Sequence, residues 1–109
     1  MITREMLVAS AKAVGRVNRY YATNEDYLDG LLVYWKPHED GDQAMRLMAN
    51  LLMSVVCLMP KIRVTTTVGD TEVGCVLIVG EGDDTAQVMR HAIVEVAAKC
   101  WEVMDGQQG

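Results

Sequence analysis

The segment from Lys61 to Val79 constrains the fold most, because its pattern predicts two antiparallel strands joined by a tight turn. Its first part alternates strictly between two kinds of residue, as a strand with one buried face does. One face carries Ile62, Val64, Thr66 and Val68, and the other carries Lys61, Arg63, Thr65 and Thr67. Gly69-Asp70 supplies a two-residue turn, and residues 71–79 return as the partner strand.

The returning strand is apolar on both of its faces. Cys75, Leu77 and Val79 share one face, and Val76 and Ile78 share the opposite one. An antiparallel strand with one face in water normally alternates between apolar and polar residues. We therefore expect this strand to be covered on both sides.

Apolar residues recur at helical spacing in three segments of the chain. Thr3 suits the N-cap of the first segment, and Gly15 suits its end. An acidic turn at residues 39–42 suits the start of the second segment. The predicted helices cover residues 3–15, 42–53 and 85–104, and residues 105–109 form a frayed tail.

The segments between these helices are shorter. Residues 31–35 are β-branched and aromatic, which favours a strand that Pro37 ends. Residues 54–59 are apolar, and their periodicity does not decide between a strand and an extension of the preceding helix. Pro60 ends this segment in either case. Residues 16–29 are predicted to be mostly loop.

These elements predict an α+β fold, a three-layer α–β–α sandwich with a small, mainly antiparallel sheet and about three helices. The 109 residues form one domain, residues 1–109, and half of them are apolar, which is enough for a core. The edges of a small sheet invite pairing, so we expect a homo-oligomer. The eight methionines fill the core or line an interface.

Charge and cysteine usage narrow the function classes. Fifteen acidic against ten basic residues leave a net charge of −5 with no basic stripe, so nucleic-acid binding is not expected. No apolar run reaches about 18 residues and no signal-peptide pattern opens the chain, so a cytoplasmic protein without a membrane segment is expected. The three cysteines lack the spacing of a zinc site or a disulfide framework, and we predict no metal and no cofactor.

No serine or cysteine stands beside a candidate base in a known catalytic motif, so no enzyme is expected. The acidic residues beside His38 are interpreted as a turn and a helix cap rather than a cation site. Gly80-Glu81-Gly82 precedes a helix as a phosphate-binding loop does, but Asp83 and Asp84 would repel a phosphate. We interpret this segment as a helix-entry loop.

Two sets of residues are candidates for binding. A small anionic ligand could stack on Trp35 and pair with Arg46, Arg90 and His91, with Tyr34 and Arg63 as alternatives for the stacking and the pairing. The alternative for the first four of these residues is structural: a turn, exposed surface and a side-chain hydrogen bond. The loop tyrosines are candidates for an interface, because tyrosine brings contact area and a hydroxyl at little entropic cost. They are Tyr20, Tyr21 and Tyr27.

Two stretches of the chain resemble those of a known family. The stretch from Trp35 to Leu47, with Trp35-Lys36-Pro37 followed by Asp40-Gly41-Asp42, and the segment from Met89 to Ala98 are similar to parts of the phage ABA sandwich family. The resemblance implies a sandwich fold, an origin in a phage or prophage, a location in the host cytoplasm and no catalytic residues. It favours a non-enzymatic accessory protein that binds a host protein such as a defence component. The alternative is an oligomeric binder that sequesters a small anionic ligand such as a signalling nucleotide.

Overall fold

The computed structural model describes residues 2–17 and 35–108. Along the chain the elements are α1 (Arg4–Val17), α3 (Gly41–Asn50), β1 (Ser54–Leu58), β2 (Lys61–Val68), β3 (Thr71–Ile78) and α4 (Thr85–Gln108). The strands form one antiparallel sheet in the order β1-β2-β3. The predicted α+β class, with three helices and a small antiparallel sheet in the described ranges, is confirmed.

The hairpin of β2 and β3 lies where the alternation predicts it. Pairing runs from Lys61 opposite Ile78 to Val68 opposite Thr71. Gly69 has a φ of 59°, a left-handed conformation that suits glycine in a tight hairpin turn. Ile62 and Val64 are fully buried on the face toward α4, which we call the inner face of the sheet.

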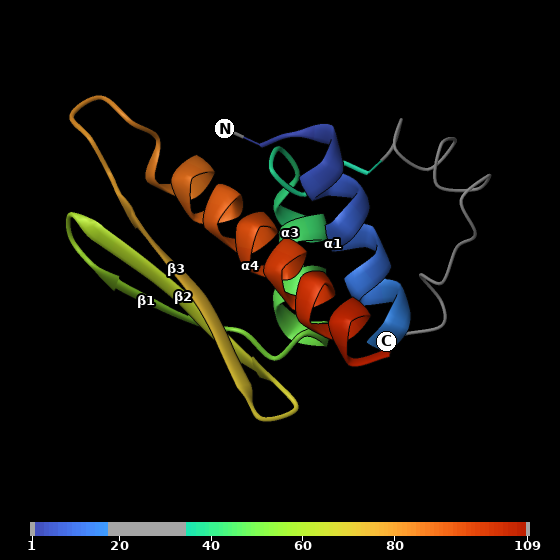
Figure 1. The fold of residues 1–109 in the computed structure, drawn as a ribbon. Coiled ribbons are helices and arrows are strands. Elements are labelled where there is room, and N and C mark those ends of the chain that lie inside the picture. The colour runs from blue at the N-terminus through green and yellow to red at the C-terminus, as the bar shows by residue number, and fades with distance from the viewer. Residues whose placement is uncertain (1, 18–34, 109) are drawn as a thin grey trace.

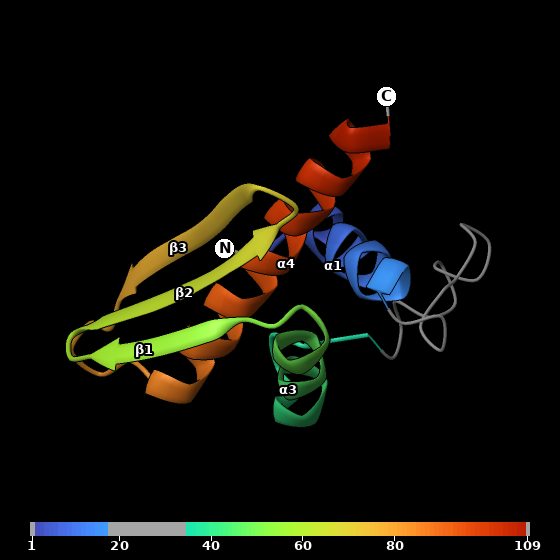
Figure 2. The same ribbon diagram turned by 90° about the horizontal axis from the view of Figure 1, so that it is seen from below.

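The three helices of the described residues all lie on the inner side of the sheet. Helix α4 packs against β2 and β3, and α1 and α3 pack against α4 (Figure 1). Turning the molecule shows the same order, with α4 between the sheet and α1 (Figure 2). The sheet is therefore an outer layer of the described structure rather than the middle layer that the sequence predicts.

The outer side of β3 differs from the prediction for the same reason. Val76 and Ile78 are 49% and 58% exposed, so this strand is covered on its inner face only by the residues described here. On the inner face, helix α4 covers β2 and β3. Helices α1 and α3 bury their own apolar stripes against α4 and leave nothing for the second face.

The predicted caps begin α1 and α3. The backbone N–H of Met6 donates to Thr3 Oγ1 at 3.2 Å. The Asp40 carboxylate accepts from the N–H groups of Asp42 and Gln43 at 2.9 and 3.2 Å. Each cap satisfies amides that have no partner within the helix.

The end of α3 settles the ambiguity at residues 54–59. The N–H of Met53 donates to the carbonyl of Met48 and that of Leu52 to Ala49, which closes the helix in a Schellman motif. Leu52 takes the left-handed position of this motif, with a φ of 52°. The chain then leaves as strand β1, and the Thr66 hydroxyl donates to the Leu51 carbonyl at 2.7 Å, which ties this corner to β2.

Two helices are longer than their patterns predict. Helix α1 passes through Gly15, which is buried, and ends at Val17. Helix α4 continues to Gln108, so the predicted tail is helical over 105–108. Packing against α4 accounts for the passage of α1 through the buried Gly15, because tertiary contact overrides a single weak stop signal. The added residues Asp105 and Gly106 of α4 are exposed.

The core is one continuous cluster to which both the helices and the sheet contribute. Within the described ranges, no helix is long and apolar enough to span a membrane. The predicted loop tyrosines Tyr20, Tyr21 and Tyr27 lie outside the described residues, as does most of the strand predicted at 31–35. Trp35, its last residue, belongs to neither a helix nor a strand.

Candidate functional site

Trp35, the predicted stacking residue, lies in the core. Its side chain is only 5% exposed. The indole Nε1–H donates to Ser10 Oγ at 3.0 Å, and the same hydroxyl donates to the Leu7 carbonyl at 2.8 Å. This chain of hydrogen bonds fastens the segment before α3 to α1. The face of the indole is therefore packed against protein rather than open to a ligand.

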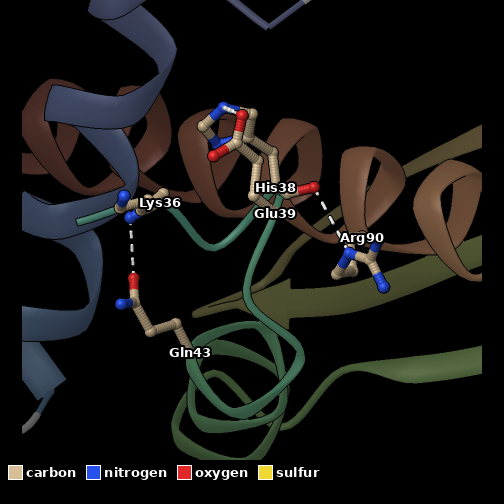
Figure 3. A network of polar contacts seen from close by, with 5 residues as sticks. All are labelled: Lys36, His38, Glu39, Gln43 and Arg90. Carbon is tan, nitrogen blue, oxygen red and sulfur yellow. Dashed lines mark hydrogen bonds and ion pairs between the residues drawn. The ribbon is translucent and has the colours of Figure 1, made fainter. Parts of the chain in front are cut away.

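Arg90 lies against the turn before α3 (Figure 3), and His91 faces the same turn through His38. Arg90 Nε donates to the His38 carbonyl at 3.3 Å, and the rings of His38 and His91 lie 6.1 Å apart. On the other side of the turn, the Lys36 N–H donates to Gln43 Oε1 at 2.7 Å. These contacts tie the turn to α3 and α4. Of the four predicted ligand residues, only Arg90 and His91 are brought together by these contacts.

The imidazole of His91 favours its neutral form. Burial lowers the pKa of His91 below the ordinary 6.5, and the positive charges of His38 and Arg90 lower it further, while Glu95 opposes them. The unfolded chain therefore binds more protons than the folded chain around and below this pH. By linkage, the free energy of unfolding rises with pH in this range. The contribution of His91 is lost as the pH falls from the ordinary pKa through the lowered pKa.

We expect acidification from about pH 7 to pH 5 to destabilise the wild type more than a His91→Gln variant. Urea unfolding of both proteins at several pH values measures the difference between them. Carboxylates titrate in both proteins, so their contribution cancels in the comparison. Parallel pH curves for the two proteins would show that His91 is not responsible.

In the loop before α4, aspartate carboxylates of the loop itself accept hydrogen bonds from nearby backbone N–H groups. Asp83 Oδ2 accepts from the Gly80 N–H at 2.7 Å, and Asp84 Oδ1 accepts from the Ala86 N–H at 3.0 Å. The amides that could hold a phosphate are thus occupied, as the interpretation of a helix-entry loop requires. In residues 2–17 and 35–108, no three His, Cys, Asp or Glu side chains come together to hold a metal ion.

The buried thiols are poor nucleophiles. Burial raises the pKa of Cys75 to about 11, and the nearby Glu95 carboxylate adds to the rise. Burial also raises the pKa of Cys100 to about 11. A thiol at neutral pH with such a pKa is almost entirely protonated and unreactive. The third thiol, on Cys57, is exposed on β1.

The outer side of the sheet carries a mixed apolar and basic surface. Leu58, Lys61 and Ile78 are aligned across the three strands, and Val56, Arg63 and Val76 form the next row. Aligned residues of neighbouring antiparallel strands project from the same face. In each row a cation lies between two aliphatic side chains, and all six residues are exposed. We call these six residues the outer-face patch.

The two cations of the patch are unpaired within the described part of the chain. Neither Lys61 nor Arg63 has an ion-pair partner there, although the chain as a whole is acidic. The rows beyond the patch are polar. They border a shallow depression of about 350 Å³ that Ser54, Thr65, Thr67 and Glu72 help to line.

No family model, curated protein or solved structure matches this chain. The resemblance to the phage ABA sandwich family therefore stays a prediction, and the candidate surface must be judged on its own chemistry.

Apart from Arg63, the outer-face patch lies outside the site residues that the sequence predicts. The sequence nevertheless carries its signal, because Val76 and Ile78 form a second apolar face and Lys61 and Arg63 lie on the polar side of the alternation. The sequence predicts that this second face is covered. The positions of the described helices show that they leave it exposed.

Proposed function

We propose that this chain is a small non-enzymatic accessory protein that binds a partner protein through the outer-face patch. The observation that carries the proposal is a sheet face that the described residues leave exposed, on which four aliphatic side chains enclose two cations that have no ion-pair partner among those residues. Clustered apolar residues on a surface are typical of interaction sites. On the resemblance to the phage family, we further propose a phage or prophage origin and a host protein as the partner.

The chemistry of the patch indicates what the partner presents. Aliphatic side chains of a partner would bury Val56, Leu58, Val76 and Ile78. Carboxylates between them would pair with the cations of the central strand, since charge complementarity steers encounter and fixes register. We therefore propose a partner surface that is both apolar and acidic, such as one face of an amphipathic helix.

A protein suits this surface better than a small molecule does. Small-ligand sites are concave pockets that bury most of the ligand, whereas the patch is the face of an open sheet. Sequestration of an anionic nucleotide has less support, because Trp35 is buried and Arg90 Nε is bonded to the His38 carbonyl. A thermal-shift screen with nucleotides tests this alternative, which a rise of several degrees with one nucleotide would favour.

The proposal is tested by reversing one charge of the patch. We expect Arg63→Glu to weaken partner binding at least about tenfold, because it places a carboxylate where the partner presents acidic groups. Arg46→Glu, on the exposed side of α3, makes the same charge change away from the patch. It is the matched control.

Immobilised wild-type and variant chains first identify proteins from a host extract that Arg63→Glu loses and Arg46→Glu retains. Titration calorimetry with the purified candidate then measures the three dissociation constants. A candidate that binds wild type and Arg63→Glu equally well would contradict the proposed surface.

A further inference from the structure

We propose that strand β1 is a self-association edge, where a second copy of this chain pairs antiparallel with β1 to form a continuous six-stranded sheet. The inference does not rest on the proposed function. It follows from the residues of β1, from the contrast between the two edges of the sheet and from the residues that flank β1.

Strand β1 is a bare edge. Among residues 2–17 and 35–108 it pairs with β2 on one side only, so its other side has backbone N–H and C=O groups without a strand partner in these ranges. Its sequence from Ser54 to Leu58 holds no charge and no proline, the features with which proteins usually protect an edge. Cys57 shares the inner face with buried Ile62 and yet is exposed. Strand β1 therefore extends beyond the cover that α4 provides.

The opposite edge, β3, is protected. Lys99 on α4 donates from its ammonium group to the Gly74 carbonyl at 2.9 Å. A lysine ammonium group held against the carbonyl of an edge strand opposes pairing with another chain, since pairing would displace or bury its charge. Cys75 also contacts the Ala92 carbonyl of α4, through its thiol at 3.6 Å. The two edges are thus unequal, and β1 is the one open to a further strand.

The residues that flank β1 point to the same edge. Leu52 is 83% exposed and holds a left-handed conformation that favours glycine. A leucine there costs about 1 kcal/mol or more in backbone strain, and its exposed side chain contributes little burial within one copy. Met59, at the other end of β1, is also exposed. A second copy along the edge would bury apolar side chains that a single copy leaves in water.

The cations of the outer face favour a dimer paired through the β1 edges over a dimer in which the outer faces of two copies stack. Stacked faces would bring Lys61 and Arg63 of both copies together, and like charges in contact are destabilising. Antiparallel pairing of β1 with itself has a two-fold axis perpendicular to the sheet. This pairing keeps Lys61 and Arg63 one strand away from the contact between the two copies of β1. It places the helices of both copies on the same side of the joined sheet.

Two matched substitutions test the edge. Val56 and Val76 are the same residue type in the same row of the sheet, 46% and 49% exposed, on β1 and β3 respectively. Val56→Lys would place two ammonium groups near the two-fold axis, whereas Val76→Lys would place them two strands away. We expect light scattering after size exclusion, at micromolar to millimolar concentration, to give about twice 12.1 kDa for wild type and Val76→Lys. Val56→Lys should be monomeric.

Any other combination of monomer and dimer among these three proteins overturns the inference. A monomeric wild type over the whole range excludes self-pairing. Loss of the dimer in both variants indicates face stacking, and loss only in Val76→Lys indicates the β3 edge. Circular dichroism and melting confirm that each variant is folded. Arg63→Glu should remain dimeric, so a failure of the proposed function can be told apart from a failure of this inference.

Discussion

Replacing Ile62 with alanine should lower the free energy of unfolding by about 2–5 kcal/mol, a large share of the ~5–15 kcal/mol that holds a typical domain folded. Ile62 is 0% exposed on the central strand, beneath α4. Its loss leaves a cavity at the junction of sheet and helix that neither element can close alone, because each is held by the other. Urea unfolding followed by circular dichroism measures the change.

Ile78→Ala is the matched control for this substitution. It removes the same atoms from the neighbouring strand, but Ile78 is 58% exposed on the outer face. We expect a change within about 0.5 kcal/mol, the usual range for surface substitutions. Equal losses at the two positions would mean that the outer face is as well covered as the inner one, and would contradict the open patch on which the proposed function depends.

Ser10→Ala should destabilise the fold by about 1–3 kcal/mol, because it leaves the indole N–H of Trp35 buried without an acceptor. The hydroxyl of Ser10 is the link between α1 and the segment that leads into α3. Its removal should therefore loosen the attachment of that segment as well as lower the overall stability.

A Trp101→Phe background leaves Trp35 as the single tryptophan, so its fluorescence reports this site alone. We expect the Ser10→Ala variant to unfold at lower urea concentration, with Trp35 emission already altered before the main transition. Ser54→Ala, on exposed β1, removes a hydroxyl without a buried partner and should leave the midpoint unchanged. An unchanged midpoint for Ser10→Ala as well would show that the hydrogen bond contributes no net stability.

The hairpin was predictable because its information is local. Strict alternation assigns each residue of β2 to a face, and Gly69-Asp70 sets the turn that fixes the register. The caps at Thr3 and Asp40 are local in the same way, since each side chain bonds amides two or three residues along the chain.

The helix ends and β1 were less predictable because they depend on contacts distant in sequence. Gly15 suits the end of a helix, but α1 continues to Val17, and α4 continues past Met104. At the C-terminus of α3 a leucine, Leu52, occupies the left-handed position where glycine is usual. The residue type there therefore does not predict the end of the helix. The Thr66 hydroxyl, 14 to 15 residues away in sequence, holds the corner that follows.

The sequence by itself determined which residues of the sheet share a face, because strand periodicity follows from backbone geometry alone. It also placed the apolar second face of β3 and the alternating cations of β2 before any packing was known. Only the tertiary structure decided which of the two faces the helices cover. Both faces of β3 are apolar enough to bury, but α1 and α3 pack on α4, which lies on the inner face. This arrangement leaves the outer-face patch and the β1 edge uncovered by the described residues.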